Sequence, residues 1–259
     1  MTTTATPTLE ELRSVAQPEE LMSRVNGEHW AGRLYMRHVS LRVTRLLVPT
    51  RISADAVTWG MIASGVLAAL VLTVPHPLTP LLTFLLIQLQ LLLDCVDGEI
   101  ARWRRTCSPA GIYLDRIGHY TTDAALVIAL GVRVDGGLTS IDGWTTLGLA
   151  VGVLVLMSKA ETDLVHAARA LSGIAPAPDR GVQMRRGAVS SLRQVARYVP
   201  FNRALLAQEF SILAVVAGIA DAVAGDLWGS RILLLVLAPI AVIVAGGHLL
   251  AILRSDKLR

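Results

Sequence analysis

The longest uncharged stretch of the chain runs from Ala56 to Leu93 and reads AVTWGMIASGVLAALVLTVPHPLTPLLTFLLIQLQLLL. It holds 38 residues without Asp, Glu, Lys or Arg, and a membrane-spanning helix needs about 20 apolar residues. Its central Pro-His-Pro sequence divides it into two spans. A second uncharged run, Ile232 to Leu253, has 22 residues and holds one more span. We therefore expect a polytopic membrane protein, which excludes a secreted disulfide scaffold, a disordered chain and a freely soluble enzyme.

The other apolar stretches complete an all-α fold with six transmembrane helices. The expected spans are approximately Ala56 to Val74, Leu78 to Arg102, Ala110 to Val132, Gly143 to Val165, Ala204 to Ala224 and Ile232 to Leu253. Residues 55–259 would form this six-helix domain. Residues 1–54 would form a cytoplasmic N-terminal segment, in which arginines alternate with apolar residues from Trp30 to Val48. This pattern predicts an amphipathic helix lying in the membrane interface.

The distribution of basic residues predicts the orientation. Of the 24 Lys and Arg residues, 20 lie in one set of loops and ends, whereas only Arg133 and Arg231 fall in the opposite loops. The positive-inside rule then places both termini in the cytoplasm. The basic loop from Leu171 to Arg203 also contains a second amphipathic stretch, Val189 to Val199. Because the arginines serve as topology signals, the net charge of +4 does not indicate a nucleic-acid partner.

Acidic residues interrupt the apolar pattern where the second span ends and the third begins. The second span ends in LLLDCVDGEIARWRR (91–105), and the third begins GIYLDRIGHYTTDA (111–124). At 100° per residue one helical stripe carries Asp94, Asp97, Gly98, Ala101 and Arg102, and a second carries Gly111, Asp115 and His119. Carboxylates in a membrane helix are costly and ordinarily face a partner, a cavity or a functional site. Several of them together repel unless a cation lies between them, and oxygen ligands favour Mg²⁺ or Mn²⁺.

The glycines and arginines beside these acids suggest a substrate class. Gly98 and Gly111 leave the helix backbone uncovered near the carboxylates, which makes room for a bulky ligand. Arg102 and its neighbours Arg104 and Arg105 are suited to bind phosphate, although arginines also mark the cytoplasmic headgroup level. The pattern predicts a metal-assisted site for a phosphate-bearing substrate that opens to the cytoplasm.

The stretch from Asp94 to His119 resembles the signature of the CDP-alcohol phosphotransferase (CDP-alcohol phosphatidyltransferase) family. That signature is DxxDGxxAR, eight residues, then GxxxDxxxD, and seven of its eight fixed positions match at the right spacing. The preceding ISADAVTWGMIASG (52–65) is similar to the family's TPNxVTxxG, with Asp55 in place of Asn and Thr58 retained. The resemblance covers the first three expected spans, and the rest of the chain agrees by hydropathy.

The resemblance implies an enzyme with six membrane helices, usually a homodimer, that transfers a phosphatidyl or phospho-alcohol group from a CDP-linked donor to an acceptor hydroxyl and releases CMP. It implies two divalent ions, Mg²⁺ or Mn²⁺, and CDP-diacylglycerol as the common donor in a bacterial plasma membrane. Carried over to this chain, the metal ligands are Asp94, Asp97, Asp115 and His119, and the contacts to CDP come from Thr58, Gly98, Ala101, Arg102 and Gly111.

His119 departs from the signature, which has a fourth Asp as metal ligand and proposed base. An imidazole accepts a proton and ligates metals, but it is a poorer Mg²⁺ ligand than a carboxylate. Two hypotheses on the effect of His119 therefore remain. In one, Asp115 and His119 are the catalytic pair of a working enzyme. In the other, the chain is a catalytically silent relative that binds CDP-lipid or scaffolds a partner. Asp123, one turn beyond His119, is a further candidate to compensate.

Basic residues further along the chain are weaker candidates for an acceptor site. Lys159, with Arg185 and Arg186, is suited to a phosphate on the acceptor, as in family members that use inositol phosphate or glycerol phosphate. Pairing of Lys159 with Asp163, four residues on, is the simpler interpretation. A transporter is a third class of function, but it predicts charges spread across the membrane depth, whereas these acids cluster at the expected cytoplasmic ends.

Overall fold

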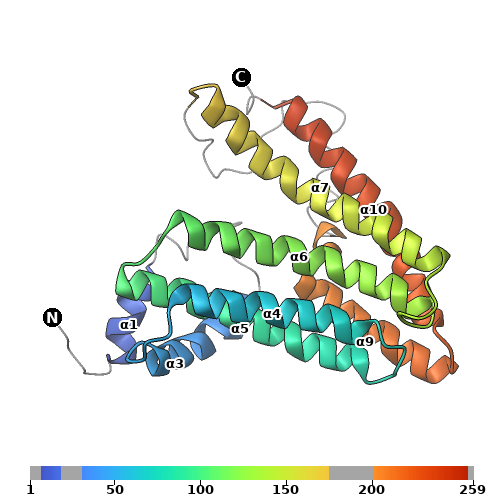
Figure 1. Cartoon of the computed structure of the whole chain (residues 1–259), viewed down its shortest axis with the longest axis horizontal. Coiled ribbons are helices and arrows are strands. Elements are labelled where there is room, and N and C mark those ends of the chain that lie inside the picture. Colours follow the sequence, from blue (N-terminus) through green and yellow to red (C-terminus); the bar gives the residue numbers. More distant parts are fainter. Residues whose placement is uncertain (1–6, 19–30, 175–200, 256–259) are drawn as a thin grey trace. The chain divides into compact units, whose positions relative to one another are not determined.

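Helices make up the regular structure of the protein in the computed structural model, which describes residues 7–18, 31–174 and 201–255. Within these ranges there are eight α-helices and no strand (Figure 1). The N-terminal part contains α1 (Leu9–Ala16), a π-helical turn η1 (Gly32–Met36) and α3 (Arg37–Leu47). The longer helices are α4 (Ala54–Leu72), α5 (Thr79–Arg104), α6 (Pro109–Val134), α7 (Gly143–Leu171), α9 (Ala207–Ala224) and α10 (Trp228–Leu253), and a short 3-10 turn, η2 (Phe201–Leu205), precedes α9.

Five of these helices are long and apolar enough to cross a membrane, namely α4, α5, α7, α9 and α10. The third expected span coincides with α6, which has 26 residues but does not belong to this set. Polar residues such as Asp115, His119 and Asp123 lower its hydropathy. The sixth span therefore stays a prediction.

Each expected span falls on a helix, but the ends differ. Helix α7 continues six residues past the expected end at Val165, because the following HAARAL contains strong helix formers. Gly173, with φ +69°, lies just beyond the C-terminal end, where a left-handed residue commonly terminates a helix. The expected start of the fifth span at Ala204 lies in η2, and the α-helix begins at Ala207.

The chain forms two compact units, and the boundary runs through the long helices. The first unit comprises residues 1–67 and 85–121, and the second comprises residues 68–84 and 122–259. The expected division into residues 1–54 and 55–259 stays a prediction. Thr58 and all positions of the signature from Asp94 to His119 lie in the first unit.

Two apolar clusters hold the first unit together. Val57 of α4 packs with Val96 and Ile100 of α5, and partly buried residues of α3 lie against them. Leu12 and Ala16 of α1 pack with Leu41 of α3, and Trp103 of α5 lies against this second cluster. Helix α6 approaches α4 closely at Gly118, where an added β-carbon would overlap Met61 Cε. This close approach fixes α6 against α4 at the residue just before His119.

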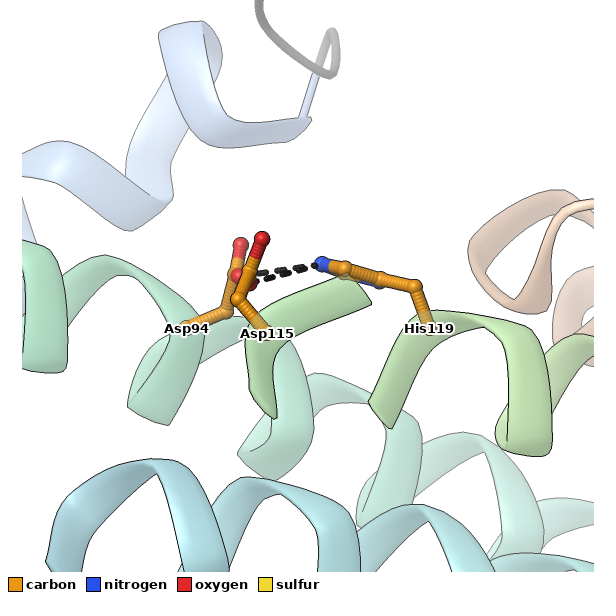
Figure 2. A group of neighbouring side chains, drawn as sticks. All are labelled: Asp94, Asp115 and His119. Carbon is orange, nitrogen blue, oxygen red and sulfur yellow. Dashed lines mark hydrogen bonds and ion pairs between the residues drawn. The ribbon is translucent and has the colours of Figure 1, made fainter. Parts of the chain in front are cut away.

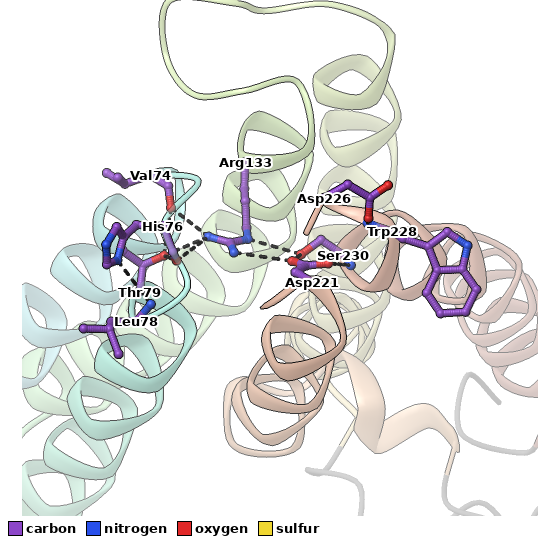
Figure 3. Close-up of polar contacts among 9 residues, drawn as sticks. All are labelled: Val74, His76, Leu78, Thr79, Arg133, Asp221, Asp226, Trp228 and Ser230. Atoms are coloured by element: carbon purple, nitrogen blue, oxygen red, sulfur yellow. Dashed lines mark hydrogen bonds and ion pairs between the residues drawn. The ribbon is translucent and has the colours of Figure 1, made fainter. Parts of the chain in front are cut away.

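A buried ion pair lies in the second unit, and Figure 3 shows its surroundings. The Arg133 guanidinium is 1% exposed and lies 3.4 Å from Asp221 Oδ2. Its Nη1 donates to the carbonyl oxygen of Val74 at 2.7 Å and to Thr79 Oγ1 at 2.8 Å. Ser230 Oγ donates to Asp221 Oδ2 at 2.6 Å. The sequence analysis placed Arg133 in a loop. In the structure its side chain is buried and links α6 to α9, α10 and the turn before α5.

Candidate metal and nucleotide site

Three predicted site residues come together between α5 and α6 in the first unit. Asp94 Oδ1 lies 3.1 Å from His119 Nε2, and Asp115 Oδ1 lies 3.4 Å from the same nitrogen. One ligand atom from each residue falls within 4.8 Å of the others. Figure 2 shows the His119 ring extending along α6 toward both carboxylates. Asp115 and His119 share a face because they are four residues apart on one helix.

This group has the chemistry of a divalent-cation site. Two carboxylates held this close repel each other unless a positive charge lies between them. Carboxylate oxygens suit Mg²⁺ and Mn²⁺, and an imidazole nitrogen is accepted more readily by Mn²⁺ and later transition metals than by Mg²⁺. The donor set of Asp94, Asp115 and His119 therefore fits a divalent metal, and its mixed character favours Mn²⁺.

Asp97 lies next to this group but is held by other partners. Its Oδ2 accepts a hydrogen bond from Thr58 Oγ1 at 2.6 Å, and its Oδ1 accepts one from the backbone N–H of Gly98 at 2.5 Å. The structure thus brings two predicted site residues, Thr58 and Asp97, into direct contact across α4 and α5. Thr58 thus orients the Asp97 carboxylate, whereas the sequence analysis predicted only a contact of Thr58 with CDP. Whether Asp97 ligates a metal stays a prediction.

Two glycines are predicted to contact the nucleotide, and the space beside Gly111 is open whereas the space beside Gly98 is covered by a side chain. At Gly111 an added β-carbon would meet only ordinary contacts, with Ser108 Oγ at 3.5 Å and Asp55 Oδ1 at 3.7 Å. At Gly98 it would lie 3.0 Å from Arg102 Nη1 and 3.2 Å from Nη2. The guanidinium therefore lies directly over the bare backbone of Gly98. Ala101, on the same stripe, is half-buried.

Glu99 is a residue of this region that the sequence reasoning missed. It lies within the signature, yet its side chain is fully buried. Its carboxylate accepts hydrogen bonds at 2.6 Å from both Ser40 Oγ and Thr44 Oγ1 of α3 and at 2.8 Å from Gln17 Nε2. The available signal was a Ser and a Thr four residues apart on the polar face of a predicted amphipathic helix. Nothing in the sequence indicated that this face meets α5.

The weaker acceptor candidates are only partly described. Lys159 Nζ lies 2.6 Å from Asp123 Oδ2, and both residues belong to the second unit. Asp123 Oδ1 also accepts a hydrogen bond from the backbone N–H of Ala207 at 2.8 Å. Asp123 is therefore engaged with Lys159 and with the start of α9. Its role as a carboxylate that compensates for His119 stays a prediction. Arg185 and Arg186, the second amphipathic stretch and Trp30 lie outside the described residues.

Comparison with known proteins yields one family. The family model described as CDP-alcohol phosphatidyltransferase matches residues 51–185, about half of the chain. A search of curated proteins found no match. The matched range contains the group formed by Asp94, Asp115 and His119, the Thr58–Asp97 pair and Lys159. The resemblance drawn from the signature residues is confirmed.

Proposed function

Because the chain belongs to the CDP-alcohol phosphatidyltransferase family, we propose that it transfers a phosphatidyl or phospho-alcohol group from a CDP-linked donor, most simply CDP-diacylglycerol, to an acceptor hydroxyl. Membership makes it a membrane transferase with a CDP-alcohol substrate. The observation that carries the proposal is the convergence of Asp94, Asp115 and His119 within the matched range. The product would be a phosphodiester of phospholipid or cell-envelope synthesis.

We assign the metal to the residues that the signature names. Asp94, Asp115 and His119 would hold one divalent ion, and Asp97, oriented by Thr58, would help to hold a second. When bound, such ions neutralise the pyrophosphate and stabilise the charge that develops as phosphorus is transferred. Ala101 and Gly111 would leave space for the nucleotide, and Arg102, which lies over the bare backbone of Gly98, would donate hydrogen bonds to its phosphates.

The transfer itself moves one phosphoryl centre between two oxygens. The acceptor oxygen attacks the phosphorus that carries the alcohol, and the bond from that phosphorus to the bridging oxygen breaks. CMP departs with the electron pair of that bond. For the hydroxyl proton we propose the pair of Asp115 and His119: a carboxylate oxygen of Asp115 would accept the proton, while His119 ligates the ion and orients Asp115. Asp94 and Asp115 orient the ring, because both carboxylates lie within 3.4 Å of Nε2.

The acceptor part of the proposal rests on sequence alone. Lys159, Arg185 and Arg186 would bind a phosphate or polyol group of the acceptor, as inositol phosphate or glycerol phosphate types would offer. The ion pair of Lys159 with Asp123 is an observation against a primary role for this lysine in phosphate binding. A polyol hydroxyl acceptor without a phosphate is the alternative that this pair favours.

The topological proposal has α6 as a sixth span, with a homodimer in the plasma membrane. Residues 1–54 would lie on the cytoplasmic side with the helix from Trp30 to Val48 at the interface, and residues 55–259 would form the membrane domain. Leu34 and Leu46 support an interfacial placement, because they are 68% and 72% exposed on the N-terminal part. The active site would open to the cytoplasm, where both termini lie.

The function is tested by measuring CMP release from purified protein in detergent with CDP-diacylglycerol and a panel of polyol and phosphorylated acceptors. We expect release that requires Mn²⁺ or Mg²⁺ and an acceptor, and that is lost in Asp94→Asn. Metal-independent release, or release unchanged in Asp94→Asn, would contradict the assignment.

His119 supports a second candidate function, a silent relative that binds CDP-lipid. The contact of His119 with Asp94 brings a nitrogen to the place where the family signature has a carboxylate. A wild-type protein that binds CDP but releases no CMP, together with an active His119→Asp variant, would favour this second function.

A further inference from the structure

The signature segment of α5 is held from outside the site by the N-terminal part of the chain. The contacts concentrate on Glu99, which follows Asp97 and Gly98 directly. Three donors converge on its buried carboxylate, two from α3 and one from Gln17 at the end of α1. Arg37 Nη1 lies 3.6 Å from the same carboxylate. A buried charge with this many partners fixes the rotation of the helix that carries it.

A second contact joins α1 to a predicted nucleotide-binding residue. Arg102 Nε donates a hydrogen bond to the backbone carbonyl oxygen of Ala16 at 2.6 Å. The carbonyl thereby takes one of the five guanidinium N–H groups and turns the two terminal nitrogens toward Gly98. Arg102 is thus oriented by α1, while its terminal nitrogens lie above the bare backbone of Gly98.

Two further interactions keep the N-terminal part against α5. Arg104 donates from Nη2 to the carbonyl oxygens of Val48 at 3.0 Å and of Thr50 at 2.8 Å, just beyond the C-terminal end of α3. A basic side chain at this place satisfies carbonyls that the helix leaves unpaired. Fully buried Leu12 packs α1 against Leu41 and Trp103. An eight-residue helix is marginal alone, so its position depends on this packing.

We propose that α1 and α3 are positioning elements of the nucleotide site, which hold the Arg102 guanidinium ready for the pyrophosphate of a CDP-linked ligand. This inference rests on the proposed function. It assigns to the N-terminal part a role beyond membrane anchoring, with Glu99 and the Ala16 carbonyl as the two points of attachment. Glu99 itself is a positioning residue, because its carboxylate is occupied by donors from α1 and α3. A pre-oriented arginine loses less conformational entropy when it binds phosphate.

The experiment compares the binding of CDP to full-length variants in detergent with Mn²⁺, by calorimetry. Leu12→Asp places a charge in the cluster that holds α1 and should detach it. Leu9→Asp is the matched control, because Leu9 is 40% exposed on the same helix. Leu12→Met, which conserves volume and apolar character, should retain the binding of CDP. A second, independent variant, Ser40→Ala with Thr44→Val, removes two donors to Glu99 without touching the site.

We expect the dissociation constant for CDP to rise about tenfold in Leu12→Asp and in the double variant, the loss expected for one charge-assisted hydrogen bond. Leu9→Asp and Leu12→Met should bind as wild type does. In turnover, Leu12→Asp and the double variant should raise KM for the CDP donor with kcat little changed. The unfolding temperature of each variant shows that the fold is retained.

Two results would overturn the inference in different ways. If Leu12→Asp and the double variant bind CDP as tightly as wild type while Arg102→Ala binds weakly, the nucleotide site stands and the N-terminal part does not position it. If Arg102→Ala also binds CDP as wild type does, the nucleotide site itself is misassigned and the proposed function fails with the inference.

Discussion

At the scale of single residues, the Arg102 guanidinium lies so close to Gly98 that the methyl group of an alanine at position 98 would press against it. An added β-carbon would lie 3.0 Å from Arg102 Nη1, so Gly98→Ala should displace the guanidinium. We expect CDP affinity to fall about tenfold, the value of a lost charge-assisted hydrogen bond. Gly246→Ala is the control, because nothing lies within 4 Å of an added β-carbon there. Equal CDP affinity in the two variants would show that Arg102 does not bind the nucleotide from this position.

The second residue-scale prediction concerns His119 and the choice of metal. Replacing the imidazole by a carboxylate gives the site an all-oxygen donor set, which Mg²⁺ prefers. His119→Asp should therefore keep CMP release and shift its preference from Mn²⁺ toward Mg²⁺. His119→Ala removes a metal ligand beside the proposed proton acceptor Asp115 and should lower kcat about a hundredfold. The measurement is CMP release under each metal; an unchanged metal preference in His119→Asp would show that this side chain does not contact the ion.

At the scale of helices, Asp135 supplies a cap for α7 from the preceding loop. Its Oδ2 accepts hydrogen bonds from the backbone N–H groups of Asp142 and Thr145, both at 2.8 Å, and from Thr145 Oγ1 at 2.7 Å. Partial burial raises the pKa of Asp135, but the hydrogen bonds from Thr145, Asp142 and Trp144 outweigh it and leave the pKa below its usual value. The carboxylate thus stabilises the folded state when it is ionised.

The prediction for Asp135 follows from the sign of that shift. A lowered folded-state pKa gives stability that is present above the unfolded pKa of about 3.9 and is lost as the pH falls through the lower folded value. At pH 7 we expect Asp135→Ala to lower the free energy of unfolding by about 1 kcal/mol, as for the loss of other helix caps. Thermal unfolding in detergent from pH 7 to 3 measures both effects, and the variant's deficit should shrink toward pH 3. A deficit independent of pH would contradict the cap.

The helices were the predictable part of the fold, and the polar contacts between them were not. Two uncharged runs place α4, α5 and α10, and the other apolar stretches place α6, α7 and α9. The spacing of Asp115 and His119 places them on one face of α6. The partners of Glu99 could not be found in this way, because Ser40 and Thr44 lie 59 and 55 residues away in sequence. Arg133 was assigned to a loop because the expected span ended at Val132, and its partner Asp221 lies 88 residues further on. Helical periodicity shows which residues share a face of one helix, but it does not show which other helix that face contacts.

At the scale of the whole molecule, we propose an orientation of the chain in the membrane. The split of basic residues predicts that the loop from Leu171 to Arg203 is cytoplasmic and that the loop between α6 and α7 lies outside. Single cysteines at Ser190 and Ser140, in a chain with Cys95 and Cys107 replaced by serine, report each side. An impermeant reagent added to intact cells should label Ser140→Cys and miss Ser190→Cys. The reverse pattern would invert the orientation.

The central claim is that Asp94, Asp115 and His119 form a metal site on which CDP binding depends. Its most direct test is calorimetric titration of CDP into the purified protein, with and without Mn²⁺, in wild type and in Asp115→Asn. Asp142→Asn is the control, because this acidic residue lies outside the signature, at the start of α7. We predict Mn²⁺-dependent binding in wild type and control, and a loss of at least about tenfold in Asp115→Asn, because the metal loses a charged ligand. Equal affinity and equal metal dependence in all three proteins would contradict the claim.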